Sequence, residues 1–356
     1  MAVGMLSSIM VGIIFGGKAA FVDAIVIPDE ERIEGFRQRN YSWPIPNGRI
    51  VPNTPGWDRL MRQRIRQVEA METPHKTEKY DAWVSVMTQA LVVPNFTQFG
   101  WAVTKAPPTL VEEIQEELRA GFASNYEEGH DPAIVGNHPQ LMVDLSPELI
   151  DRALSSLLPL HEAWARIPLT PFRGYGLRIY RNTSALYMHL DKASTHVISG
   201  ILHIDHSIDC QPWPLVIEDL EGITQTVYLN HGDLLFYESA KCLHGRPLPL
   251  EGSWYTSLFL HYSPAGNWPL AEEDWAAQYA IPDHWESVME GEEYLDLPQL
   301  QMVDTAMIEP GCPNLWCETG NFNIEASSWP NQAREGVATS SHGIEQVLMD
   351  DAREEL

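Results

Sequence analysis

Residues 195–204 read THVISGILHI, a stretch of β-branched and aliphatic residues broken only by single small or polar positions. Runs of this composition and length predict β-strands. Similar runs lie on either side of it, separated by Gly, Pro, Asn or Asp: 176–180, 215–217, 224–229, 233–237 and 255–262. Closely spaced strands without helical crossovers favour antiparallel pairing, so we predict a sandwich or barrel, with a jelly roll as the natural candidate.

Helical patterns precede this strand-rich region, at about 58–70, 107–120 and 146–166. The predicted fold class is therefore α+β, with a double-stranded β-helix (jelly-roll) core, flanking N-terminal helices, and irregular N- and C-terminal extensions. We expect a leader at 1–27, an irregular wrapping segment at 28–94, the core domain at 95–265, and an acidic extension at 266–356 with one helix at 272–279.

The overall composition limits the kinds of partner. The 356-residue chain is 44% hydrophobic and 20% charged, which is enough to bury a large core. Its formal net charge of −26 leaves no excess of Lys and Arg to neutralise phosphates. We therefore expect no nucleic-acid partner. The sequence does not predict an oligomeric state.

Both ends of the chain bear on localisation. The first 17 residues, MAVGMLSSIMVGIIFGG, are uncharged with an apolar centre, typical of a secretory signal or a short signal-anchor. A buried N-terminal strand or helix is the alternative. The chain ends in REEL (353–356), similar to the K-D-E-L signal for endoplasmic reticulum retention. We predict a luminal protein, with the cytoplasm as runner-up and membrane attachment only if the leader is an uncleaved anchor.

Two further features are compatible with the lumen. Glycosylation sequons begin at Asn40, Asn95 and Asn182, and they are used only if the chain enters the secretory route. The chain has four cysteines. Cys312 and Cys317 enclose a short loop and could form a disulfide, whereas Cys210 and Cys242 lie far apart in the sequence and are expected to be thiols.

The pair His189-Leu-Asp191 is the first candidate for metal chemistry. Side chains two positions apart project to the same side of an extended strand, so both could contact one ion. A second pair, His203-Ile-Asp205, has the same spacing and stays open as an alternative. A third ligand is expected after the strand at 233–237, and His244 is our choice. Two imidazoles and one carboxylate leave coordination positions open, as in non-haem Fe(II) oxygenases.

The order of these motifs resembles the Fe(II)/2-oxoglutarate-dependent dioxygenases, and within that superfamily the prolyl 4-hydroxylase-like branch. The resemblance spans about Phe99 to Pro264 and consists of YGLRIY (175–180), HLD (189–191), the strand from 197, GDLLF (232–236), His244 with Pro247, and GSW (252–254). It implies that His189, Asp191 and His244 bind iron and that Tyr180 lines the 2-oxoglutarate pocket. It also favours His189 and Asp191 over the pair at 203 and 205.

The chain departs from that family pattern at Ser253, where a lysine normally holds the distal carboxylate of 2-oxoglutarate. A dianion in an apolar barrel needs a cationic partner. Arg246 lies two residues after His244 and is our first candidate, because a guanidinium matches a carboxylate in shape. Arg178 is the second candidate; Lys192 and Lys241 are weaker ones. A surface salt bridge of Arg246 is the alternative reading.

The resemblance implies oxidative decarboxylation of 2-oxoglutarate coupled to hydroxylation of a C–H bond, with dioxygen as co-substrate and ascorbate as an auxiliary reductant. The expected substrate is a peptidyl residue such as proline, or else a small molecule. A cupin-like or catalytically inactive jelly-roll binding module is the alternative function. Residues that could line the cavity mouth are Glu218, Asp219, Trp213, Tyr187 and Trp254. A place in the barrel core is the alternative for the three aromatic residues, and the preferred one for Trp254. We expect His206, His231 and His261 to be surface or structural histidines.

Overall fold

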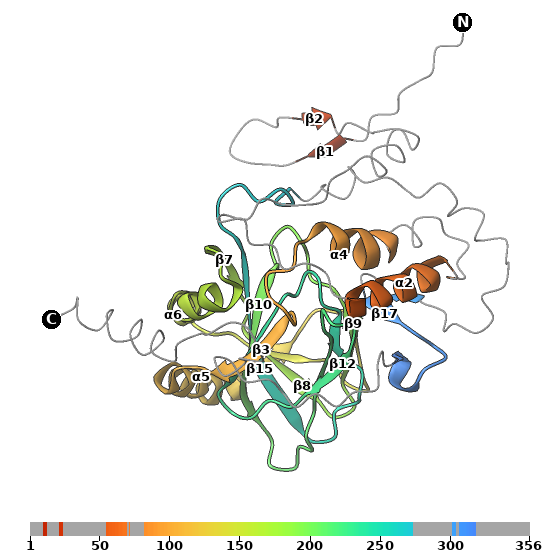
Figure 1. Ribbon diagram of the computed structural model, residues 1–356. Coiled ribbons are helices and arrows are strands. Elements are labelled where there is room, and N and C mark those ends of the chain that lie inside the picture. Colours follow the sequence, from red (N-terminus) through yellow and green to blue (C-terminus); the bar gives the residue numbers. More distant parts are fainter. Residues whose placement is uncertain are drawn as a thin grey trace, which may run out of the picture.

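Strand β10 (Ile198–His206) lies at the centre of the structure, and every residue in it except the last two is buried. Figure 1 shows the computed structural model, which describes residues 10–12, 21–23, 55–69, 71, 82–272, 301–303 and 306–317. The largely apolar composition of THVISGILHI follows from this position, because a strand covered on both faces has no solvent side. It pairs antiparallel with β13 (Asp233–Tyr237) and β15 (Trp254–Pro264).

Two antiparallel sheets build the core. The major sheet has the order β3-β13-β10-β15-β8-β6-β4, with β7 also paired to β15. Its other strands are β3 (Trp101–Lys105), β4 (Tyr126–Glu127), β6 (Leu141–Val143), β7 (Leu169–Gly174) and β8 (Leu177–Arg181). The minor sheet has the order β12-β11-β14-β9-β17-β16, with β5 also paired to β9. Its strands within the expected core domain are β5 (Ile134–Val135), β9 (Ala185–His189), β11 (Leu215–Glu218), β12 (Thr224–Val227) and β14 (His244–Arg246).

The chain passes repeatedly between the two sheets. In sequence order, β8, β10, β13 and β15 belong to the major sheet, while β9, β11, β12 and β14 fall between them and belong to the minor sheet. Buried side chains of both sheets, such as Ile201 and Leu235 of the major and Met188 and Ile217 of the minor, pack into one cluster. The alternation of strands around a shared interior is a double-stranded β-helix, so the predicted jelly roll is confirmed.

Two of the expected helices pack on the major sheet. Helix α5 (Pro108–Gly121) leads into a short 3-10 turn, η2 (Phe122–Ser124). Ser146 is the N-cap of α6 (Pro147–Ala165), and its hydroxyl accepts a hydrogen bond from the backbone N–H of Leu149. An N-cap of this kind satisfies one of the free donors at a helix start. Gly200 of β10 permits the close approach of α6, because a Cβ there would lie 2.6 Å from His161 Nε2.

The segment before residue 95 is more helical than predicted. Helix α2 (Pro55–Glu69) matches the expected one, but a π-helix η1 (Trp83–Thr88) running into α4 (Gln89–Val92) was not expected. The stretch VSVMTQALVV is rich in β-branched residues, so its local composition favours a strand. Packing decides otherwise, since Val86, Met87 and Ala90 are buried in one cluster with Leu60 and Met61 of α2.

Part of the predicted C-terminal extension belongs to the core. Strands β16 (Gln301–Val303) and β17 (Ala306–Ile308) form a hairpin, and Ala306 of β17 pairs with His189 of β9. A 3-10 turn, η5 (Pro313–Leu315), follows within the loop that the Cys312–Cys317 disulfide closes. The expected disulfide is therefore present. The boundary placed at 265 does not mark the end of the folded core.

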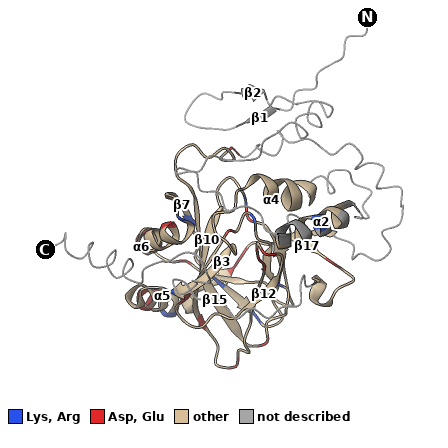
Figure 2. Cartoon of the chain, in the orientation of Figure 1, with Lys and Arg blue, Asp and Glu red and all other residues tan. Residues whose placement is uncertain are grey.

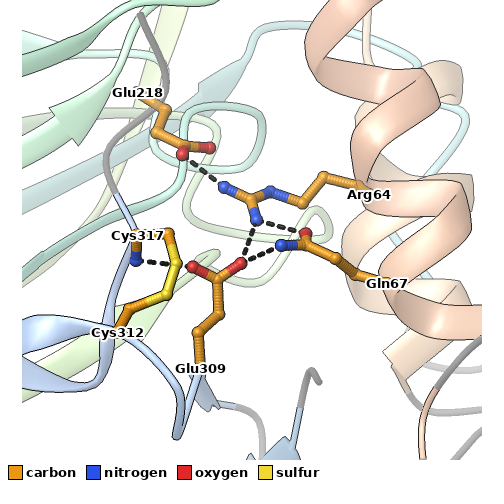
Figure 3. Close-up of a disulfide and its surroundings, with 6 residues drawn as sticks. All are labelled: Arg64, Gln67, Glu218, Glu309, Cys312 and Cys317. Carbon is orange, nitrogen blue, oxygen red and sulfur yellow. Dashed lines mark hydrogen bonds and ion pairs between the residues drawn. A yellow bond between two sulfur atoms is a disulfide. The ribbon is translucent and has the colours of Figure 1, made fainter. Parts of the chain in front are cut away.

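A buried polar cluster joins the two flanking segments (Figure 3). The guanidinium of Arg64 on α2 forms ion pairs with Glu218 of β11 and with Glu309, the second at 2.6 Å. Gln67 donates to Glu309, and the Cys317 backbone N–H donates to the same carboxylate at 2.6 Å. Glu218 was expected at the cavity mouth, and the structure corrects this: the side chain is fully buried beside α2.

Little of the predicted leader and tail can be compared with the structure. Within 1–27 the structure describes only β1 (Met10–Gly12) and β2 (Phe21–Asp23), which pair with one another. The helix expected at 272–279 lies outside the described residues, as does Asn40. Among the helices that are described, none combines the length and the apolar character needed to cross a bilayer.

Candidate metal centre and its cavity

Three predicted ligands meet at the facing ends of β9 and β14. His189 is the last residue of β9, His244 is the first of β14, and the two are directly paired in the sheet. Asp191 follows β9 by two residues, with its Oδ1 3.7 Å from His189 Nε2 and 3.9 Å from His244 Nε2. The three ligand atoms lie within 4.8 Å of one another. One ion could contact all three.

Both imidazoles are oriented by backbone carbonyls. His189 Nδ1 lies 2.9 Å from the Tyr187 carbonyl oxygen, and His244 Nδ1 lies 2.9 Å from that of Cys242. A carbonyl oxygen can only accept, so each Nδ1 carries the proton and each Nε2 presents a lone pair to the shared point. Burial also lowers the pKa of His244 well below its usual value, which keeps this ring neutral at pH 7.

The Asp191 carboxylate has no Lys or Arg partner among the described residues. Burial raises its pKa to about 6, and its Oδ2 has no hydrogen-bond partner among the described residues. An orphaned buried oxygen is costly unless a ligand satisfies it. The two imidazoles and this carboxylate form the 2-His-1-carboxylate donor set that suits Fe(II) and leaves positions open. The residues present therefore fit a divalent metal of this kind.

A cavity of about 490 Å³ opens from the three ligands and contains a second set of polar groups at its inner end. Tyr180 is 1% exposed, and its hydroxyl has no partner in the described part of the chain. Arg246 is also buried, donates to the Trp213 carbonyl and, at 3.2 Å, to the Tyr255 hydroxyl, and has no carboxylate partner among the described residues. Its guanidinium lies over the rings of Trp213 and Tyr255, 4.6 and 4.7 Å from their centroids.

The other candidate cations are placed differently. Arg178 lines the cavity but is held by Glu128, with N–O distances of 2.5 and 2.6 Å, and lies 3.7 Å from Asp131. Lys241 is buried and donates to the Val93 carbonyl at 2.7 Å, away from the cavity. Lys192 is exposed and lies in the cavity wall. The structure does not support Arg178 or Lys241 as a free cation for a co-substrate, and Arg246 remains the first candidate.

The rival pair at 203 and 205 does not form a metal site with a third ligand among the described residues. His203 stacks on Tyr255 with ring centroids 4.2 Å apart and bonds the Thr256 carbonyl and His206. Asp205 accepts the backbone N–H of His206. These contacts give both residues structural roles.

Two residues near the ligands make contacts that the sequence did not reveal, although the prediction that His261 has a structural role is consistent with its burial and its bond to Ser199. Gln89 on α4 donates to the Asp191 carbonyl at 2.6 Å and to the Ala240 carbonyl at 2.8 Å. It therefore connects the loop that follows β9 to the loop that precedes β14. His261 was expected to be a surface or structural histidine. It is buried, bonded to Ser199 at 2.8 Å, and its Nδ1 lies 3.7 Å from Asp191 Oδ2. Neither contact has a local sequence signal.

Comparison with known proteins gives the following. No family model matches the chain, and no curated protein matches its sequence. The solved structures that it is similar to include a Pseudomonas putida prolyl-4-hydroxylase, with 19% identity over 50% of this chain and 100% of that one and a TM-score of 0.40. Another is HygX from Streptomyces hygroscopicus with nickel, 2-oxoglutarate and hygromycin B, with 14% identity over 47% of this chain and 84% of that one and a TM-score of 0.35. A third is a Trichoplax adhaerens prolyl hydroxylase with a peptide fragment of hypoxia inducible factor, with 11% identity over 55% of this chain and 96% of that one and a TM-score of 0.36. At these scores the likeness carries no argument, and the assignment below rests on strand order and site geometry.

Proposed function

We propose that this protein is a non-haem Fe(II) dioxygenase that couples decarboxylation of 2-oxoglutarate to hydroxylation of a C–H bond. One observation carries the proposal: a single cavity of a double-stranded β-helix is lined by a 2-His-1-carboxylate set, a buried arginine and a buried tyrosine. Within the part of the chain that the structure describes, the arginine has no carboxylate partner and the tyrosine hydroxyl has no hydrogen-bond partner. The similar structures from S. hygroscopicus contain iron, or nickel with 2-oxoglutarate, which is consistent with these cofactors.

The chain's own residues have distinct parts in this chemistry. His189, Asp191 and His244 would hold the metal, and their backbone partners fix the orientation of the rings. Arg246 would neutralise the distal carboxylate of 2-oxoglutarate, and the Tyr180 hydroxyl would donate to it. Tyr180 and Arg246 are 1% and 2% exposed, and electrostatic contacts are stronger at buried positions than in water. When bound, Fe(II) and 2-oxoglutarate would activate dioxygen, which is the oxidant for the hydroxylation.

The proposal is tested by adding Fe(II) and 2-oxoglutarate to the full chain without oxygen. We expect the visible metal-to-ligand charge-transfer band of the ternary complex, and slow release of succinate once air is admitted. A chain that shows neither band nor succinate is not an oxygenase. The alternative, a cupin-like or inactive binding module, predicts metal binding without either signal.

Arg246→Gln is expected to weaken 2-oxoglutarate binding about 10- to 100-fold, because a charge-assisted hydrogen bond contributes roughly 1.5–3 kcal/mol. The measurement is a titration of 2-oxoglutarate into the Fe(II) protein without oxygen, followed by the charge-transfer band. Arg119→Gln, on the exposed side of α5, is the matched control. An unchanged dissociation constant in Arg246→Gln would remove this residue from the co-substrate site.

For the substrate, we propose a peptidyl residue, with proline as the first choice and a small molecule as the alternative. The similar Trichoplax structure contains a peptide, and the similar HygX structure contains hygromycin B, so both kinds of substrate occur among the neighbours. A mass shift of 16 in a proline-containing peptide, dependent on Fe(II) and 2-oxoglutarate, would identify the peptide class. Ascorbate remains a proposed auxiliary reductant.

We also propose that the protein works in the endoplasmic reticulum lumen. The Cys312–Cys317 disulfide supports an oxidising compartment. Asn182 is exposed on the turn between β8 and β9, whereas Asn95 is 2% exposed and could not hold a glycan in the folded chain. We expect Asn182→Gln, but not Asn95→Gln, to remove a glycan detected by enzymatic deglycosylation. A glycan-free protein in the cytosolic fraction would contradict this localisation.

A further inference from the structure

Five residues at the outer end of the cavity form a group that the proposed metal and co-substrate sites do not use. We call this group the mouth cluster: Phe172, Arg173, Tyr175, Lys192 and His196, all of which line the cavity. Tyr175 and His196 are joined by a hydrogen bond of 3.2 Å, and the Arg173 guanidinium lies 4.8 Å from the centre of the Tyr175 ring. Phe172 is 50% exposed, with its ring 5.5 Å from His196.

The two cations of the mouth cluster have no carboxylate partner. Among the described residues, neither Arg173 nor Lys192 forms an ion pair, although the acidic residues Glu128 and Asp131 line the same cavity. Those two carboxylates already pair with Arg178. Arg173 and Lys192 thus provide positive charge that nothing in the described structure neutralises.

The overall charge of the protein makes this local excess informative. A chain with a net charge of −26 repels anions at long range, and Lys and Arg are few and scattered over the fold (Figure 2). The cavity lining contains three carboxylates and four cations, so the unpaired Arg173 and Lys192 at its rim leave a local excess of positive charge, which attracts anions. Burial, together with the charges of Lys192 and Arg173, lowers the pKa of His196 to about 4, so at pH 7 this ring adds hydrogen-bonding capacity without charge.

The mouth cluster lies one side-chain layer from the metal ligands. The ring of His196 is 4.0 Å from that of His261, centroid to centroid, and His261 Nδ1 is 3.7 Å from Asp191 Oδ2. A group bound between Arg173 and Lys192 would therefore be close to the reacting centre. Arg246 at the inner end stays available for the co-substrate, so the two anionic groups have separate partners.

We propose that the mouth cluster recognises an anionic group on the substrate, and that this group is a carboxylate beside the atom to be hydroxylated. The role of the mouth cluster in substrate recognition rests on the proposed oxygenase function. The binding of the anion does not, because Arg173 and Lys192 belong to the chain whether or not a metal is present. An acidic peptide and a free carboxylated small molecule share this chemistry.

The test uses the metal-free full chain and isothermal titration calorimetry at low salt. The probes are the peptide acetyl-Gly-Glu-Pro-Glu-Gly-amide, its analogue with Gln at both Glu positions, and free N-acetylglutamate. Each is measured with the wild type, with Arg173→Gln/Lys192→Gln, and with Lys105→Gln/Arg119→Gln. The last variant removes the same charge from exposed positions outside the cavity.

We expect the wild type and the Lys105/Arg119 variant to bind a carboxylated probe about tenfold more tightly than the Gln peptide, since two exposed ion pairs each contribute modestly to affinity. The Arg173/Lys192 variant should lose this preference.

Preference for the Glu peptide over N-acetylglutamate indicates a peptide source, and equal binding indicates a small molecule. No preference in the wild type, or one that survives in the Arg173/Lys192 variant, overturns the inference. Because the charge-transfer band is measured separately, failure of the oxygenase proposal is distinguishable from failure of this one.

Discussion

Replacing His244 with alanine is expected to abolish the charge-transfer band that Fe(II) and 2-oxoglutarate give with the wild type. His244 is 3% exposed and supplies one of three ligand atoms around the shared point, and its Nδ1 is already bonded to a backbone carbonyl. Removing a contact that merely orients a ligand typically costs 10- to 100-fold in metal affinity, so removing the ligand itself should cost at least about 100-fold. Equilibrium dialysis with Fe(II), under nitrogen, measures this loss directly.

The matched control for this variant is His231→Ala. His231 is exposed on the turn before β13, bonds the Ile204 carbonyl, and does not line the cavity. We expect it to keep both the band and the metal affinity, and thermal unfolding should show that His244→Ala still folds. An unaltered band in His244→Ala, together with a band lost in His203→Ala, would transfer the metal site to the rival pair and refute the assignment.

The strands that the sequence predicts best are those with the strongest burial. The boundaries expected for β13, 233–237, are those observed, and every residue of β13 is buried. Strands β9 and β14, which carry the histidine ligands, were not predicted. β14 has only three residues, and Gly245 in its centre lacks a side chain that would mark it as a strand. Such a strand exists because β9 and β11 pair with it on either side, not because of local preference.

The meeting of His189, Asp191 and His244 was predictable because their order along the chain carries information, and the choice of Arg246 rests on its spacing from His244. The supporting residues carry no such signal. Gln89 reaches Asp191 across a sequence separation of 102 residues, and β17 pairs with β9 from a region read as an acidic extension. Contacts of this kind are set by tertiary packing, so a pattern within one segment cannot reveal them. The site is therefore supported by both flanks of the predicted domain.

The buried cluster around Arg64 gives the largest expected effect on stability: Arg64→Met should lower the free energy of unfolding by about 3–5 kcal/mol. Breaking a buried ion pair by removing one partner leaves the other charge uncompensated. Arg64 is 1% exposed and pairs with two carboxylates that are each fully buried, those of Glu218 and Glu309. The guanidinium also lies 4.4 Å from the centre of the Trp316 ring, so packing is lost as well. Urea unfolding at pH 7, followed by tryptophan fluorescence, measures the change.

Two further variants separate the loss of the ion pair from damage to helix α2. Arg62→Met makes the same substitution at an exposed position of that helix, and it should change the free energy of unfolding by less than about 0.5 kcal/mol. Combining Arg64→Met with Glu218→Gln and Glu309→Gln removes the uncompensated charges and should recover a large part of the loss, since neutral replacement of a buried ion pair is often tolerated. Equal unfolding free energies for Arg62→Met and Arg64→Met would mean that the cluster does not hold the flanks together. A triple variant no more stable than Arg64→Met would place the loss in packing against Trp316, with the buried carboxylates contributing little.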